Sequence, residues 1–164
     1  MKKLILLLCI LVVVVVLVGC GQSEESLEGL PLEEKISKTV HHVIGEEVNG
    51  MEPVKELGIT ELSTGNLANV VIIREMPLTE SSLKREILSD SAELFEKLFS
   101  FEELGEVNLT WENELFDQYG KGEYKPTMRI RLTKDTAEKI TWDNFDYFNF
   151  ENVSDQYWQH DILD

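Results

Sequence analysis

Apolar and polar positions divide the chain into segments with different periods, and these periods predict its secondary structure. An uninterrupted apolar run extends from Leu4 to Val18. Apolar residues then recur at helical spacing from Leu32 to about Glu47, and again from Thr79 to about Phe101. We therefore predict two amphipathic helices after the N-terminal apolar run.

Four further segments have patterns that are typical of strands. Two apolar runs over residues 54–62 and 67–76 flank a turn cluster, which predicts a hairpin. Apolar residues alternate with polar ones over residues 107–115 and again over 124–132, which predicts a second hairpin. Thr133 is a suitable cap for a short helix over residues 134–140. This order of elements predicts an α+β fold, a largely antiparallel four-stranded sheet with helices packed on one face.

The N-terminal segment resembles the signal peptide of a bacterial lipoprotein. Lys2 and Lys3 precede the apolar run, and the sequence Leu17-Val18-Gly19-Cys20 resembles the lipobox. In the lipobox, cleavage occurs before a cysteine that carries a diacylglycerol, so the resemblance implies lipidation of Cys20. At about 1.5 Å per residue the apolar run spans only roughly 22 Å, less than a hydrocarbon core of about 30 Å. A short membrane anchor or a plain secretory signal is the alternative, but neither accounts for a cysteine directly after a small residue.

We therefore expect three parts: a signal-peptide helix over residues 1–19, a lipidated cysteine with a flexible tether over 20–30, and a single α+β domain over 31–164. In this make-up the chain resembles small uncharacterised lipoproteins of Gram-positive bacteria. The resemblance implies anchoring by fatty-acyl chains such as palmitate on the extracytoplasmic face of the cell membrane. Nothing in the residues excludes the envelope of a Gram-negative bacterium.

The charge of the chain limits the partners that it can have. It holds 31 acidic and 15 basic residues, a formal net charge of −16, and loss of Lys2 and Lys3 with the signal makes it more acidic. Such a balance argues against nucleic acid and against a domain that lies flat on anionic lipid. We expect a monomer that contacts the membrane only through the lipid on Cys20.

The residues offer few candidates for chemistry. Cys9 would leave with the signal and Cys20 would carry the lipid, so no thiol remains for a disulfide, a nucleophile or a metal. Ser81 and Lys84 have the S-x-x-K spacing of serine β-lactamases, but the companion motifs of those enzymes are missing. His41 and His42 are helical neighbours that point about 100° apart, too divergent to bind one metal ion. We expect no catalytic site, no metal and no cofactor.

The C-terminal segment is the least regular part of the chain and the richest in aromatic residues. Residues 142–158 contain seven of the fourteen aromatic residues, interleaved with Asp and Asn. The carboxylates could bind calcium, although the order of a known calcium loop is absent. The aromatic residues could instead cover the sheet or contact a partner. We expect Trp142 and Phe145 to be structural, and Tyr157 and Trp158 to contact a partner.

These observations favour a non-enzymatic binding or accessory module that acts on another, unknown envelope component, in particular an envelope protein. The alternative is a hydrolase or a metal-dependent enzyme with an unrecognised site. A deep pocket with converging polar groups would favour the enzyme, and a shallow aromatic surface would favour the binding module.

Overall fold

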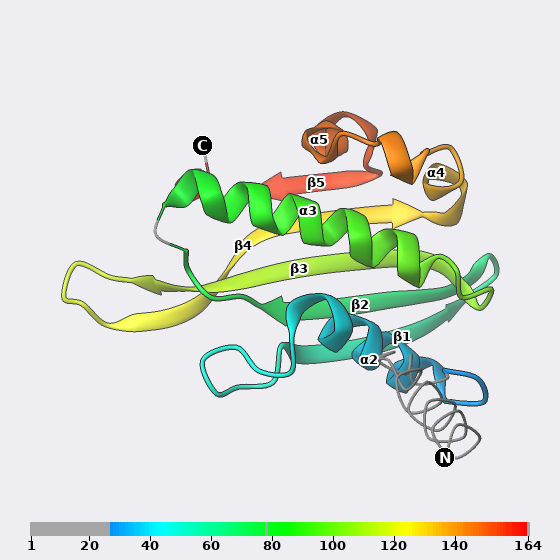
Figure 1. Ribbon diagram of the computed structural model, residues 1–164, viewed down its shortest axis with the longest axis horizontal. Helices are drawn as coiled ribbons and strands as arrows, with labels where there is room; N and C mark the ends of the chain where they lie inside the picture. Colours follow the sequence, from blue (N-terminus) through cyan, green and yellow to red (C-terminus); the bar gives the residue numbers. More distant parts are fainter. Residues whose placement is uncertain (1–26, 78, 164) are drawn as a thin grey trace, which may run out of the picture.

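The computed structural model describes residues 27–77 and 79–163, and the predicted signal peptide and Cys20 lie outside this part. Five strands form one sheet in the order β1-β2-β3-β4-β5, and the helices lie on one face of it (Figure 1). The strands are β1 (Val54–Leu62), β2 (Gly65–Ile73), β3 (Leu104–Phe116), β4 (Gly122–Thr133) and β5 (Gln156–Gln159).

The α+β class is as predicted, but the four-stranded, largely antiparallel sheet needs two corrections. The sheet has a fifth strand, β5, which pairs antiparallel with β4, and β2 and β3 pair in parallel. The parallel pair follows from the connection between these strands, because α3 (Glu80–Leu98) returns the chain to the end of the sheet at which β2 begins. β5 has only four residues within the irregular aromatic segment, too few for a recognisable period.

The helices bury their apolar faces against the sheet. The side chain of Thr79 accepts a hydrogen bond from the amide of Ser82 at 3.2 Å and thereby caps α3. Leu83, Ile87 and Leu94 of α3 are completely buried. The first helix, α2 (Leu32–Ile44), ends at Ile44, slightly before its predicted end near Glu47.

Alternate residues of the three central strands form the opposite side of the core. In β3 the fully buried Trp111 donates from its indole nitrogen to the Ser91 hydroxyl of α3 at 2.9 Å. The buried residues of these strands on the helix side include Ala68, Val70, Ile72, Leu104, Val107, Leu109, Trp111, Met128, Ile130 and Leu132.

The C-terminal segment lies beside α3 and then returns to the sheet as β5 (Figure 1). Phe150 is fully buried, and its ring centroid lies 5.6 Å from that of Phe95 and 4.9 Å from that of Phe145. Trp142 and Phe145 are half-buried against the same core, in agreement with a structural role. The short elements of this segment are α4 (Lys134–Ala137), η1 (Trp142–Asn144), η2 (Tyr147–Asn149), α5 (Phe150–Val153) and η3 (Asp161–Leu163).

Candidate functional site

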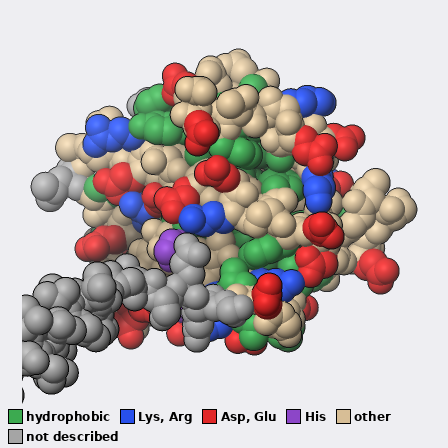
Figure 2. Space-filling model, turned by 45° about the vertical axis from the view of Figure 1, so that its right-hand side comes forward, with side chains coloured by type: hydrophobic (Ala, Val, Ile, Leu, Met, Phe, Trp, Pro, Cys, Tyr) green, Lys and Arg blue, Asp and Glu red, His purple; other side chains and the backbone are tan. Residues whose placement is uncertain are grey.

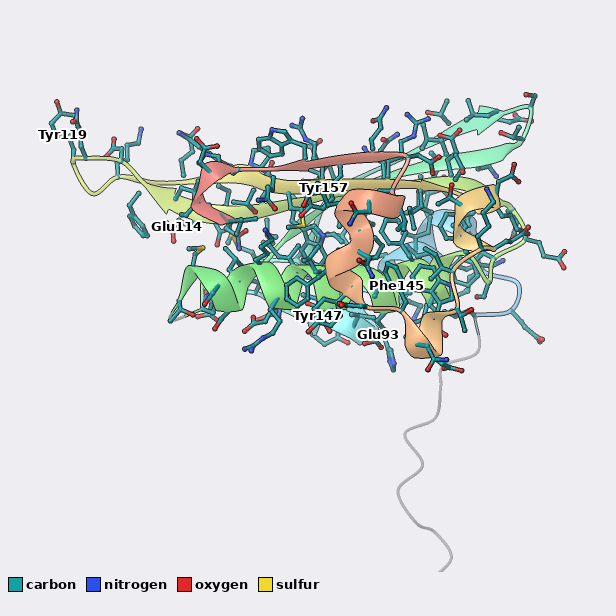
Figure 3. The ribbon with its side chains drawn as sticks, turned by 90° about the horizontal axis from the view of Figure 1, so that it is seen from above. Glu93, Glu114, Tyr119, Phe145, Tyr147 and Tyr157 are labelled. Carbon is teal, nitrogen blue, oxygen red and sulfur yellow. The ribbon has the colours of Figure 1, made fainter. Side chains whose placement is uncertain are left out.

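The face of the sheet opposite the helices is open. Viewed along the sheet, the described helices form a single layer on one side, and only side chains project from the other side (Figure 3). Successive residues of a strand point to opposite faces, so every second residue of β1 to β5 belongs to this open face.

The strand register aligns the side chains of the open face in rows that run across β2, β3, β4 and β5. Two adjacent rows line a shallow groove of about 650 Å³. The polar row contains Asn69, Asn108, Arg131 and Gln156, and the mixed row contains Val71, Thr110, Arg129 and Trp158.

Ion pairs flank the two rows. Nε of Arg131 donates to Oε2 of Glu106 at 2.9 Å, on the outer side of the polar row. Beyond the mixed row, Nζ of Lys55 donates to Oε2 of Glu112 at 2.6 Å, and this hydrogen bond raises the pKa of Lys55. These four charged groups are therefore already neutralised in pairs.

Arg129 and Trp158 form a cation–π pair on the open face. The guanidinium carbon of Arg129 lies 5.3 Å from the indole centroid of Trp158. Trp158 remains 43% exposed, although it sits in an ordered strand. Within residues 27–77 and 79–163, no carboxylate forms an ion pair with Arg129, and its guanidinium makes no hydrogen bond. The indole thus supports a cation whose N–H donors remain available.

The two residues predicted to contact a partner both border the groove, but their side chains point to opposite faces of β5. Trp158 pairs with Arg129 and lies on the open face, whereas Tyr157 pairs with Ile130 on the helix side. The Tyr157 side chain packs against the core, and its hydroxyl donates to Oε1 of Gln159 at 2.8 Å.

Sequence reasoning missed Arg129 as a residue of the candidate site. The alternation in 124–132 assigns it to the polar face of its strand, but only the pairing of β5 with β4 brings it to Trp158.

The motifs considered for catalysis are not assembled into a site. Ser81 is exposed in the first turn of α3, and no hydrogen bond joins it to Lys84 in the described structure. His41 lies 3.2 Å from a carboxylate oxygen of Glu46 and 3.0 Å from one of Glu52, and it connects α2 to the following loop. These contacts give His41 a structural role.

Two carboxylates of the C-terminal segment, those of Asp146 and Asp155, accept hydrogen bonds from backbone amides. Oδ2 of Asp155 accepts from the Thr133 amide at 2.7 Å, and Oδ1 accepts from the Thr136 hydroxyl at 3.2 Å. Burial raises the pKa of Asp155, but these hydrogen bonds and the nearby Arg131 charge outweigh it, so the pKa is lowered. In the part of the chain that the structure describes, no group of three or more His, Cys, Asp or Glu side chains is placed to hold a metal ion.

Other parts of the surface carry acidic groups and isolated aromatic residues. Acidic side chains are scattered over the face seen in Figure 2 and do not gather in one patch. Phe116 and Tyr119, 66% and 85% exposed, lie at the β3–β4 turn, and Tyr119 points away from the body of the molecule (Figure 3). Neither residue borders the groove on the open face.

Comparisons of the chain with family models, with curated protein sequences and with solved structures give no match. No helix within residues 27–77 and 79–163 is both long and apolar enough to span a membrane. The interpretation of the site therefore rests on the geometry of the open face.

Proposed function

We propose that this protein is a lipid-anchored lipoprotein on the extracytoplasmic face of the cell membrane and that it is a non-enzymatic binding module. The resemblance of Leu17-Val18-Gly19-Cys20 to the lipobox supports the anchor and assigns the lipid to Cys20. The open face of the sheet is the surface that binds another envelope component, and Trp158 is its main contact residue.

The exposed pair of Arg129 and Trp158 is the observation that carries this proposal. An indole can bury a large apolar area in a core, yet that of Trp158 lies on the uncovered face, beside a guanidinium that forms no ion pair with any described residue. Trp and Arg are the residue types most enriched among those that dominate binding energy at interfaces. A free protein gains little stability from such an exposed pair, so we assign it to binding.

The shape of the groove favours binding over catalysis. Its polar side chains are spread in rows over four strands, and they do not converge on one point as the groups of a catalytic site do. Its flanking carboxylates, Glu106 and Glu112, already form ion pairs with basic side chains. This arrangement offers a recognition surface without an evident general base.

The position of the chain end is compatible with anchoring. The described chain begins beside α2, at the same end of the molecule as the β1–β2 turn and opposite the β3–β4 turn (Figure 1). A lipid on Cys20 would hold the domain by this end. The open face would then remain accessible to another envelope component.

Photo-crosslinking in cells tests the proposal. A photoreactive amino acid replaces Gln156, which is exposed next to Trp158 on the open face. The control replaces Phe148, which is 51% exposed in the segment beside α3. We expect a discrete envelope adduct from position 156 only. No adduct from position 156, or the same adducts from both positions, would contradict the assignment of the binding surface.

A further inference from the structure

The open face combines the guanidinium of Arg129, which forms no ion pair with the described residues, the exposed indole of Trp158 and the three amide side chains of the polar row. We infer from this combination that the groove binds a sugar chain that carries carboxylate groups. The inference rests on the proposed binding function and specifies the chemical class of its ligand.

The charge of the groove selects an anion. Although the chain has a net charge of −16, the basic side chains of the open face balance its paired carboxylates. Lys55 pairs with Glu112 and Arg131 with Glu106, which leaves Arg129 as the charged side chain of the groove lining that no described carboxylate neutralises. The exposed carboxylate of Glu56 lies beyond Val71, at the β1 end of the mixed row, while Arg129 lies at its β5 end. A guanidinium presents its donors in a planar fork that fits the two oxygens of a carboxylate.

Trp158 holds that guanidinium in position. A side chain that is already stacked loses less conformational freedom when it binds than one that is free in solvent. The contact of 5.3 Å between guanidinium and indole therefore prepares Arg129 to bind an anion. The exposed remainder of the indole supplies an apolar surface against which the C–H face of a sugar ring can pack.

The amide side chains of the polar row can form hydrogen bonds with the hydroxyl groups of a sugar. An amide side chain both donates and accepts hydrogen bonds, as a hydroxyl does. Nδ2 of Asn108 donates to Oδ1 of Asn69 at 3.0 Å, which orients both side chains. Among the described residues, Nδ2 of Asn69 and Oδ1 of Asn108 have no partner at the groove, and Gln156 adds a third amide. The row from β2 to β5 is about 14 Å long at the usual strand spacing, which suits a short oligosaccharide.

A peptide fits this groove less well than a glycan does. An extended peptide is usually bound by the free backbone groups of an edge strand, with pockets for its side chains. Here the groove crosses the middle of the sheet, where the backbone groups of β3 and β4 already pair with neighbouring strands. Side chains alone must make the contacts, and most of them are polar.

Calorimetric titration of the full-length protein in a non-ionic detergent tests the inference. The three probes are an oligogalacturonate, a neutral malto-oligosaccharide of the same length, and an oligoglutamate peptide that carries carboxylates without sugar. We expect the oligogalacturonate to bind at least about tenfold more tightly than either of the others, because it alone offers both carboxylates and sugar rings.

Variants assign the binding to the groove. We expect R129Q and W158A each to weaken oligogalacturonate binding at least about tenfold. The control R85Q removes an equal charge from an exposed position on α3 and should leave the Kd within about twofold. R129K keeps the charge but loses the fork, and we expect an intermediate Kd. Melting curves of all variants verify that the fold is intact.

An unchanged Kd in R129Q, or an oligoglutamate that binds as tightly as the oligogalacturonate, would overturn the inference. The failure of all three probes would also overturn it, and the crosslink from position 156 would then separate two cases. If the crosslink forms, only the ligand class is wrong. If it does not form, the proposed binding function fails as well.

Discussion

At the residue scale, the buried polar contact between Trp111 and Ser91 joins β3 to α3. Both side chains are fully buried, and the indole N–H has the Ser91 hydroxyl as its acceptor at 2.9 Å. S91A leaves that donor unsatisfied, so we expect a loss of about 1–3 kcal/mol in the free energy of unfolding, measured in urea. In a W111F background the donor is gone and the same change should cost less. Equal costs in both backgrounds would contradict the role assigned to the hydrogen bond.

Asp155 gives stability a defined dependence on pH. Its pKa is lowered in the folded protein because Thr133 and Thr136 donate hydrogen bonds to the carboxylate. The contribution of Asp155 to stability is therefore fully present above the pKa that its carboxyl group has in the unfolded chain, about 3.9. It is lost as the pH falls through the lower pKa that the group has in the folded protein. We expect D155A to cost about 0.5–2 kcal/mol at pH 7.

Urea denaturation at pH 7 and at pH 3 measures this effect. The difference between the wild type and D155A should shrink at the lower pH, where the Asp155 carboxyl group of the unfolded wild type binds a proton more readily than that of the folded protein. Many other carboxylates titrate over the same range, but they are common to both proteins and cancel in the difference. A difference that stays constant over this range would mean that the ionised carboxylate is not what stabilises the contact.

Tyr157 and Trp158 show which features of the candidate site the sequence alone could not predict. Composition drew attention to both Tyr157 and Trp158, but adjacent residues of a strand point to opposite faces. The strand itself gives no local signal, because its four residues are held by pairing with β4. For the same reason the contact of Trp158 with Arg129, which links residues far apart in the sequence, could not be predicted.

At the scale of elements, the sequence predicts elements whose apolar pattern repeats over many residues, but it does not predict which distant strands pair. The apolar stripe of α3 and the alternation of β3 and β4 repeat over enough residues to identify each element. The parallel pairing of β2 with β3 has no such local pattern, since it depends on how α3 crosses the sheet. Phe150 was likewise not distinguished from neighbouring aromatic residues, although it alone among those of residues 142–158 is fully buried.

Substitution of two glycines tests the contact between the β1–β2 turn and β3. A Cβ at Gly105 would overlap the backbone of Thr64, whereas one at Gly58 in β1 would meet no atom within 4 Å. We expect G105A to lower the free energy of unfolding by about 1–3 kcal/mol, because backbone atoms have to move. G58A should be neutral or stabilise by up to about 1 kcal/mol. Equal effects of the two substitutions on the urea midpoint would show that the close approach does not matter.

At the scale of the whole molecule, we propose that a lipid at one end of the chain carries a domain with one covered and one open sheet face. The thiol of Cys20 is the acceptor that the lipobox resemblance assigns to the lipid. We therefore expect C20A to abolish incorporation of a fatty-acid probe and to leave the precursor uncleaved. C9A is the matched control, since Cys9 lies within the apolar run, and should be labelled normally. Unchanged labelling of C20A would contradict the anchor.

The central claim is that the open face binds an envelope component through Trp158, and recovery of that component from crosslinked cells tests it most directly. The full-length wild type is compared with W158A and with F148A, which removes a similarly exposed aromatic side chain from the segment beside α3. Both variants should keep their melting temperature within a few degrees, because neither side chain belongs to the buried core. We expect the component to be recovered with the wild type and F148A and to be lost with W158A. Equal recovery with all three proteins would contradict the claim.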